Sequence, residues 1–372
     1  MAQTVIGLGN ALAAKQFTAG LAVDVGRKGY YTSKFMASGE VPTRPIWKRT
    51  ELEKNAGDQV TYNLSMQLKG KPTQGDNPLE GKEEKLSLYS DSVYIDQARH
   101  AVNAGGKMSQ KRTMLNLRNI GKARLSDYFA RLFDETISMY LSGTAGQNVE
   151  FIEYNAQTPF TGYANNPFVA PDTPHLMFPG TATQATLQAS DKFSLKVVDR
   201  AVARAKRMGG GTQGVPQIQP AMIEGEKRFL LIIDPVQEFD LRNSTDDNGW
   251  AAIQKALATA LGKQSAFIQG GVGIHNNVVM HVHENVIRFT TGYGAASNTL
   301  ASRALFLGIE AGVIAFGNAG TGMSFNWKEK PTDYDNVINI AGGTMWGFKK
   351  ANYNGLDFGT IAIDTAADTT SV

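Results

Sequence analysis

Apolar and polar residues alternate strictly along residues 59–68, the pattern of a strand with one buried face. A stretch rich in Gly, Pro and charged residues follows, and residues 85–95 predict a second strand. The connection is too long for a tight turn, so the pattern predicts a two-stranded arm with a charged tip. Because an isolated hairpin is marginally stable in water, we expect the arm to rest on another element or another subunit. The apolar positions of the first strand are Val60, Tyr62, Leu64, Met66 and Leu68.

A helical repeat dominates residues 109–143. From Leu125 to Thr136, apolar side chains recur every three or four positions, and the intervening positions are mostly polar. Ser142-Gly143 is a suitable helix end. The pattern predicts one long helix with an apolar face.

The remaining chain predicts a mixed α+β fold without the strand–helix alternation of a Rossmann domain or a TIM barrel. Residues 1–50 show neither period and predict an extended arm packed on other elements. Residues 144–190 hold five prolines within 21 positions and predict an ordered but irregular segment. The other expected elements are a helix from residue 192, a buried strand at 228–235, a helix at 251–262, a strand at 273–286, a helix or buried strand at 302–317, and two or three strands from residue 337.

Composition excludes several classes of protein. The 372 residues include no cysteine, so disulfides, thiolate zinc sites, iron–sulfur clusters and a cysteine nucleophile are ruled out. No apolar run is long enough for a transmembrane helix. The first residues lack the basic start of a secretory signal, so we expect neither a membrane nor export.

The net charge of +3 conceals an uneven distribution. Residues 1–131 carry a net charge of +8, residues 132–191 a net charge of −6 with no Lys or Arg, and residues 192–372 a net charge of +1. Such asymmetry indicates two surfaces in different surroundings, one of them facing an acidic polymer. Ordinary variation along a protein surface is the alternative interpretation.

Candidate chemistry is sparse. His281 and His283 would share one face of a strand, near His275 and Glu284, and such a group could hold a metal or act as a general base. No HExxH pattern accompanies them, and histidine pairs on strands are more often structural. Because no complete nucleotide-binding or nucleophile motif is present either, we expect no catalytic residue, metal site or cofactor. An arm, a long helix and an uneven charge suit an assembling structural protein.

Motifs in a consistent order connect the chain to a known family. Residues 79–118 carry an acidic Gly-containing loop, a Ser-Asp-Ser-Val strand, Ile95-Asp96-Gln97, the step from Arg99 to Val102, and Met108-Ser109 before the long helix. Asp333-Tyr334-Asp335-Asn336 and residues 343–366 continue the pattern. On these residues the chain resembles the tailed-phage major capsid family typified by enterobacteria phage N-four. The resemblance is dense over residues 51–143 and returns over about 268–290 and 330–367.

The resemblance implies the Hong Kong 97 phage-type major capsid fold. Its parts would be an N-arm, an extended hairpin loop, a peripheral domain with a long spine helix, and an axial domain. The corresponding segments would be 1–50 for the N-arm, 51–105 for the extended hairpin loop and peripheral-domain strands, 106–143 for the spine helix, 144–190 for an irregular insertion, 191–325 for the axial domain, and 326–372 for the return to the peripheral-domain sheet and the C-terminus.

The same resemblance implies a major capsid protein that assembles in the host bacterial cytoplasm into the icosahedral head shell of a tailed bacteriophage. Expected partners are further copies in hexamers and pentamers, packaged double-stranded DNA bound without sequence preference, a portal protein, and separate scaffolding or decoration proteins. The hairpin residues expected at the subunit interface are Tyr62, Leu64, Met66, Lys69, Lys71, Lys82, Leu86 and Leu88. The basic residues expected to face DNA are Arg27, Lys28, Lys48, Arg49, Lys111, Arg112, Arg118 and Lys122.

Three other hypotheses remain open from the sequence. An encapsulin-like compartment would keep the fold but hold cargo enzymes instead of DNA. An enzyme would use His281, His283 and Glu284 with a metal. A soluble DNA-binding module would stay monomeric at low protein concentration.

Overall fold

The computed structural model of the chain contains two compact units, which the polypeptide enters more than once. Unit 1 comprises Met1–Val60, Val93–Val169 and Gly312–Lys349, and unit 2 comprises Thr61–Ser92, Ala170–Ala311 and Lys350–Val372. The structure describes residues 21–39, 42–53, 56–66, 68, 70–163, 165–208, 217–223, 226–243, 271–318 and 324–367.

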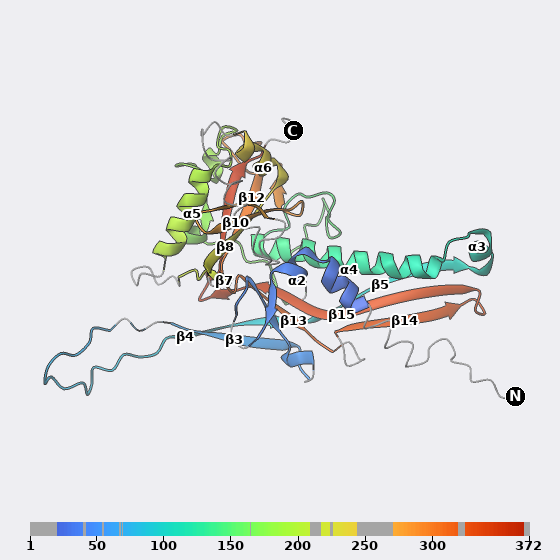
Figure 1. Cartoon of the computed structure of the whole chain (residues 1–372), viewed down its shortest axis with the longest axis horizontal. Helices are drawn as coiled ribbons and strands as arrows, with labels where there is room; N and C mark the ends of the chain where they lie inside the picture. Colours follow the sequence, from blue (N-terminus) through green and yellow to red (C-terminus); the bar gives the residue numbers. More distant parts are fainter. Residues whose placement is uncertain are drawn as a thin grey trace. The chain divides into compact units, whose positions relative to one another are not determined.

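Unit 1 is built around α4 (Leu117–Ser142) (Figure 1). The Asn116 side chain accepts a hydrogen bond from the backbone N–H of Asn119 and so caps the start of the helix. Gly143, in the left-handed conformation, ends it as the sequence predicts. The predicted helix over 109–143 is wrong in one respect, because α3 (Lys107–Arg112) is separate. The backbone is extended at Thr113, and the cap at Asn116 begins a new helix.

The sheet of unit 1 has, among the described residues, the strand order β1-β2-β13-β15-β14, with β5 also paired to β15. β15 is the long strand at its centre, and α4 lies along β5 and β15 (Figure 1). The strands are β1 (Met36–Ser38), β2 (Ile46–Arg49), β5 (Asp96–Gly106), β13 (Gly312–Phe316), β14 (Phe325–Thr332) and β15 (Val337–Lys350).

Aromatic side chains fill the space between α4 and this sheet. The Phe133 ring lies edge-on to Trp346, with centroids 4.4 Å apart, and also contacts Phe316 and Phe325. Phe129, one helical turn earlier, contacts Phe325 as well. The 3.6-residue repeat predicted from the sequence is therefore the repeat that packs the helix onto the sheet.

The described part of the predicted N-arm packs within unit 1. Residues 21–28 are helical, α2 (Tyr30–Lys34) follows, and β1 and β2 then join the sheet. Its apolar side chains recur too irregularly to reveal a period, yet Leu21, Tyr31 and Phe35 are fully buried. The predicted packing on other elements is confirmed, but the predicted extended conformation is wrong for residues 21–34, which are largely helical. Residues 1–20 lie outside the described residues.

Unit 2 contains a sheet of order β6-β18-β12-β8-β10-β9 among the described residues, with β11 beside β12 and β7 beside β8. The buried face of α5 (Leu195–Arg207) joins the core that β8, β10, β12 and β18 form. The other bounds are β6 (Leu176–Met177), β7 (Ala221–Ile223), β8 (Glu226–Ile233), α6 (Pro235–Arg242), β9 (Gly271–His275), β10 (Val278–Val282), β11 (Ile287–Phe289), β12 (Ala301–Leu307), β16 (Asn352–Tyr353), β17 (Leu356–Asp357) and β18 (Thr360–Ala366).

Two sequence predictions in this part need correction. The strand predicted over 273–286 is a hairpin, because Asn276 and Asn277 take left-handed conformations between β9 and β10. For residues 302–317 the buried-strand alternative is confirmed and the helix is wrong, but the segment forms two strands, β12 and β13, which belong to different sheets. The helix predicted at 251–262 lies outside the described residues. Residues 144–190 are irregular, as predicted, with two short 3-10 turns (Thr173–His175 and Gln184–Thr186).

Gly347 in β15 is required by a close backbone approach, which yields a testable prediction. A Cβ at this position would lie 1.8 Å from the Tyr94 carbonyl oxygen, which cannot move without shifting its strand. We expect Gly347→Ala to lower the free energy of unfolding of unit 1 by about 3 kcal/mol. Denaturant unfolding of the unassembled subunit, followed by tryptophan fluorescence, measures this loss, because Trp47, Trp327 and Trp346 all lie in unit 1.

The matched control is Gly26→Ala. Gly26 lies in the helical residues 21–28 with no atom within 4 Å of an added Cβ. Because alanine favours a helix, this variant should be neutral or slightly stabilised. Equal stability of the two variants would contradict the close-approach argument.

Candidate assembly surfaces

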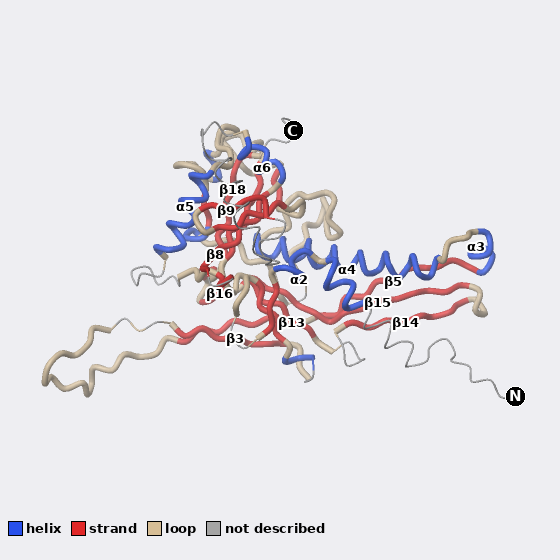
Figure 2. The backbone as a smooth tube through the Cα atoms, in the orientation of Figure 1, coloured by secondary structure: helices blue, strands red, loops and turns tan. Residues whose placement is uncertain are grey.

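The predicted hairpin arm is present in the structure. β3 (Gln59–Ser65) pairs with β4 (Leu88–Tyr94), and the backbone N–H of Met66 donates to the Ser87 carbonyl at 3.0 Å (Figure 2). A long loop joins the two strands, as the length of the connection predicts.

Burial falls along the arm from its base to its tip. Val60 is buried, Leu64 and Met66 are half-buried, and Leu68 is 64% exposed. On the returning side, Leu86 and Leu88 are 59% and 66% exposed. Lys71 and Lys82 are exposed in the loop, and Lys69 lies outside the described residues. The distal half of the arm thus carries leucines that the described part of the chain leaves uncovered.

The base of the arm is held by hydrogen bonds and ring contacts within unit 2. Tyr62, which the sequence places at a subunit interface, is instead 2% exposed, with its ring edge-on to Tyr353. Its hydroxyl donates to Asp91 at 2.8 Å, and the Asn352 backbone N–H donates to the same carboxylate oxygen. Burial raises the pKa of Tyr62 well above its ordinary value, so the hydroxyl remains a donor. Tyr353 in turn donates to Glu310 at 2.5 Å.

A second uncovered apolar region, not predicted from the sequence, lies where α3 meets α4. Met114 is fully exposed, and Met108 and Leu115 are each 62% exposed. The Lys107 backbone N–H donates to the Asn336 carbonyl at 3.1 Å, so this region adjoins the turn between β14 and β15. The sequence signal is Met114-Leu115, which interrupts the polar run between the two helices. We call α3 together with residues 113–116 the α3 tip.

The basic residues predicted to face DNA fall into two groups. Several of them form ion pairs within unit 1: Lys28 with Asp127 at 2.7 Å, Lys48 with Glu53 at 3.3 Å, Arg49 with Glu51 at 2.5 Å, and Arg118 with Glu329 at 2.9 Å. Their charges are partly compensated, which weakens their attraction for phosphate. Arg27, Lys111 and Arg112 are exposed, and Lys122 is half-buried in α4.

The histidines predicted as an alternative metal group do not converge. His275 contacts Asp199 at 2.9 Å. His281 is buried in β10, and His283 lies beyond the end of that strand, where its Nδ1 accepts from the Asn285 N–H. Within the described residues, no cluster of three metal-ligating side chains occurs.

The acidic stretch 132–191 is not simply an acidic surface, because two of its carboxylates point inward. Asp134 accepts hydrogen bonds from the backbone N–H groups of Tyr30 and Tyr31 at 2.7 and 3.0 Å, which fastens α2 to α4. Burial raises the pKa of Asp134 to about 6, against the lowering effect of these bonds. Glu135 is also buried and accepts from the Ile152 N–H at 2.7 Å. Fewer acidic residues of this stretch therefore contribute to the protein surface than the sequence suggests, so the predicted contrast between an acidic and a basic surface is smaller.

A spine helix on a β-sheet, a second sheet-and-helix unit and a hairpin arm with uncovered leucines define a shell subunit of the Hong Kong 97 type. Comparison with known proteins agrees. The family described as phage capsid protein matches residues 6–369, and the chain belongs to this family.

Individual relatives support the same conclusion. The chain is 42% identical to a chain of the capsid of Ralstonia phage GP4, with a TM-score of 0.84 and 99% of each chain covered. It is 26% identical over 350 residues to the major capsid protein of Pseudomonas phage KPP25, covering 87% of each chain. A chain of the cyanophage Pam1 capsid shares the fold, with 20% identity, a TM-score of 0.69, and 92% and 93% coverage.

The predicted fold and the predicted role are thereby confirmed. The protein is a phage major capsid protein, copies of which build the shell of the virion. The comparisons do not favour the encapsulin-like alternative. Among the described residues, no helix combines the length and apolar character that crossing a membrane requires.

The raised pKa of Asp134 predicts a pH dependence of stability. The folded chain holds this proton more tightly than the unfolded chain, whose aspartate pKa is near 3.8. The contribution of Asp134 to the free energy of unfolding should therefore rise as pH falls from about 7 to about 4, by at most about 3 kcal/mol. Thermal unfolding of the unassembled subunit at a series of pH values measures this change.

The Asp134→Asn variant isolates this group, because asparagine does not titrate. The wild type should gain stability relative to the variant as pH falls through 6. If the stability difference between wild type and variant stays constant or shrinks with falling pH, the pKa of Asp134 is not raised. The hydrogen bonds from Tyr30 and Tyr31 would then lower this pKa at least as much as burial raises it.

Proposed function

We propose that the hairpin arm is the contact by which each subunit holds its neighbour in the hexamers and pentamers of the shell. The observation that carries this proposal is the contrast along the arm. Its base is fastened by Tyr62 and Asp91 within the chain, whereas Leu68, Leu86 and Leu88 in its distal half are uncovered. Leu64 and Met66 are half-buried and complete the apolar side of β3.

Repetition in a closed shell makes a small contact energetically important. Covering one exposed leucine contributes about 2 kcal/mol, which is modest for a single contact. In a closed shell every subunit makes the contact and receives it, so a small contribution per arm stabilises the assembly many times over. The half-buried side chains and the long loop allow the arm to adapt to hexamers and pentamers.

Different segments of the chain would form the peripheral and the axial domain of the subunit. The described residues of the N-arm (1–50), of the spine helix (106–143) and of 326–349 would serve the peripheral domain, because they lie in unit 1. Those of 350–372 and most of those of 191–325 would serve the axial domain, because they lie in unit 2, so the return segment 326–372 is divided between the two units. Family membership supports a portal protein and separate scaffolding or decoration proteins as further partners. We infer that the protein acts through assembly and not through catalysis.

We also propose that packaged double-stranded DNA contacts exposed basic residues of unit 1. Arg27, Lys111 and Arg112 support this role, because they are exposed. Lys28, Lys48, Arg49 and Arg118 contribute less, because carboxylates already face them. Binding would release counterions from the DNA, so it would be independent of sequence and weakened by salt.

The arm contact predicts the effect of a double substitution. Leu86→Ser with Leu88→Ser should leave the subunit folded, because both side chains are largely exposed in it. Losing two apolar contacts should raise the subunit concentration needed for shell formation at least about tenfold. Negative-stain microscopy across a concentration series measures shell formation, and circular dichroism measures folding.

Val149→Ser is the control for this variant, since Val149 is 70% exposed but lies off the arm. It should assemble like the wild type. Removal of residues 69–85 tests the arm as a whole and should block or weaken assembly of a folded subunit. Normal shells from the double variant and from the shortened arm would disprove the assigned role.

The DNA proposal predicts a change in salt dependence. Lys111→Ala with Arg112→Ala should lower the slope of log binding constant against log salt by about 2, because two phosphate contacts are lost. Fluorescence anisotropy of a short duplex with unassembled subunits over a potassium chloride series measures the slope. Lys28→Ala with Lys48→Ala removes two compensated charges and should change it less. An equal change in both variants would contradict the grouping of these residues.

A further inference from the structure

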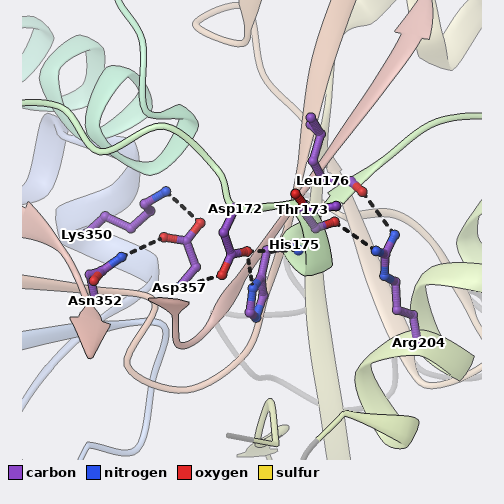
Figure 3. A network of polar contacts seen from close by, with 8 residues as sticks. All are labelled: Asp172, Thr173, His175, Leu176, Arg204, Lys350, Asn352 and Asp357. Carbon is purple, nitrogen blue, oxygen red and sulfur yellow. Dashed lines mark hydrogen bonds and ion pairs between the residues drawn. The ribbon is translucent and has the colours of Figure 1, made fainter. Parts of the chain in front are cut away.

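A buried amine and a buried carboxyl group meet beside the turn between β16 and β17 (Figure 3). Lys350 Nζ lies 2.7 Å from Asp357 Oδ2, and each side chain is 1% exposed. Asn352 pairs with Asp357 across the two strands, and Lys350 precedes Asn352 by two residues. The alternation of an extended chain therefore puts Lys350, Asn352 and Asp357 on the same face.

Keeping Lys350 and Asp357 as separate charges costs free energy at this buried position. Removing an ammonium and a carboxylate from water costs several kcal/mol per ion, and their mutual attraction often fails to restore it. Burial accordingly lowers the pKa of Lys350 and raises the pKa of Asp357. Both shifts favour the neutral pair, a free amine beside a carboxylic acid, which is the reactive pair for forming an amide.

One side-chain donor polarises the carboxyl group of Asp357, and a polar network holds the Asp357 backbone. The Asn352 side-chain amide donates to Oδ1 at 3.4 Å, opposite the oxygen that faces the amine. Asp172 accepts the Asp357 backbone N–H at 3.3 Å and contacts His175 Nδ1 at 2.5 Å. His175 is fully buried, and its Nε2 has no hydrogen-bond partner among the described residues. Arg204 donates to the carbonyls of Thr173 and Leu176 and holds this loop in place.

We propose that Lys350 and Asp357 become joined by an isopeptide bond within each chain. The Nζ lone pair attacks Cγ of the protonated Asp357 carboxyl group, and a C–N bond forms. One proton passes from nitrogen to the hydroxyl oxygen, the C–O bond breaks, and water leaves. The Asn352 amide stabilises the oxygen on which negative charge develops. No oxidant, reductant or other reactant is required.

The bond would strengthen the anchor of the arm. The turn it closes carries Tyr353, which contacts Tyr62, and the Asn352 backbone N–H, which donates to Asp91. A covalent ring through Lys350 and Asp357 would keep these groups in place when the arm is pulled. The reaction itself depends only on the geometry of unit 2 and not on the proposed role of the arm.

Another ion pair of this protein provides a matched control. Lys192 Nζ and Asp240 Oδ1 are also 2.7 Å apart, but the Lys192 side chain is 45% exposed. Water reaches the Lys192 side chain, so the cost of burying separate charges that favours a neutral pair at Lys350 is absent there. We expect no bond at Lys192, although the separation is the same.

Mass spectrometry of the full-length protein tests the proposal, on freshly purified subunits and on assembled shells. The intact chain should be lighter than its sequence by about 18 Da, the mass of one water. Trypsin should fail to cleave after Lys350, and fragmentation should place the loss on a peptide that joins Lys350 to Asp357. Peptides containing Lys192 and Asp240 should have unchanged masses.

Two variants separate this bond from other losses of water. Lys350→Arg keeps a long basic side chain but lacks the primary amine, so it should have its full sequence mass. Asp357→Asn should lose ammonia instead, about 17 Da. Full sequence mass with cleavage after Lys350 in both wild-type samples would overturn the proposal. A loss of water that persists in Lys350→Arg would also overturn it, by identifying a cyclised aspartate. Fragmentation of the wild type decides the matter even if Lys350→Arg does not fold.

Discussion

The packing of α4 on β15 is the contact on which unit 1 depends. Phe129 and Phe133 occupy one face of the helix and meet Phe325 and Trp346 on the sheet. β15 pairs with β14 on one side and with β5 along much of the other, so the position of the helix also determines where those strands can lie. Small residues make the approach possible. A Cβ at Gly342 would lie 2.8 Å from a Leu125 methyl group, which leaves no room for a larger side chain.

The rest of the chain combines well-buried cores with apolar surfaces that remain exposed in the single subunit. The two cores bury their aromatic and aliphatic residues almost completely. The distal arm and the α3 tip, in contrast, expose leucine and methionine side chains that a monomeric protein would ordinarily cover. We propose that further copies of the chain cover this exposed apolar surface in the assembled shell. The arm base, in contrast, is held within the chain by contacts among Tyr62, Asp91 and Tyr353.

Sequence reasoning succeeded where a pattern was long and local. The alternation over 59–68 predicted β3, and the spacing from Leu125 to Thr136 predicted the packed face of α4. It failed where the deciding contact lies far away in the chain. Residues 21–39 show no period, because their burial is decided by α4, including the bonds from Tyr30 and Tyr31 to Asp134. The break between α3 and α4 depends on one cap at Asn116, a signal too short to interrupt a helical pattern.

The candidate residues divide in the same way. Composition and order of motifs were enough to indicate an assembling phage capsid protein, because those properties belong to the chain itself. Which charges remain available was decided by folding, since Lys28 and Arg118 find carboxylates about 100 and 211 residues away in the sequence. Folding likewise buried Tyr62 and brought Lys350 against Asp357 in a dry site. The periodicity of the sequence shows which apolar side chains will be buried on one face of a helix or strand. Which polar side chains are buried, and which charges are paired, depends on neighbours that only the folded chain brings together.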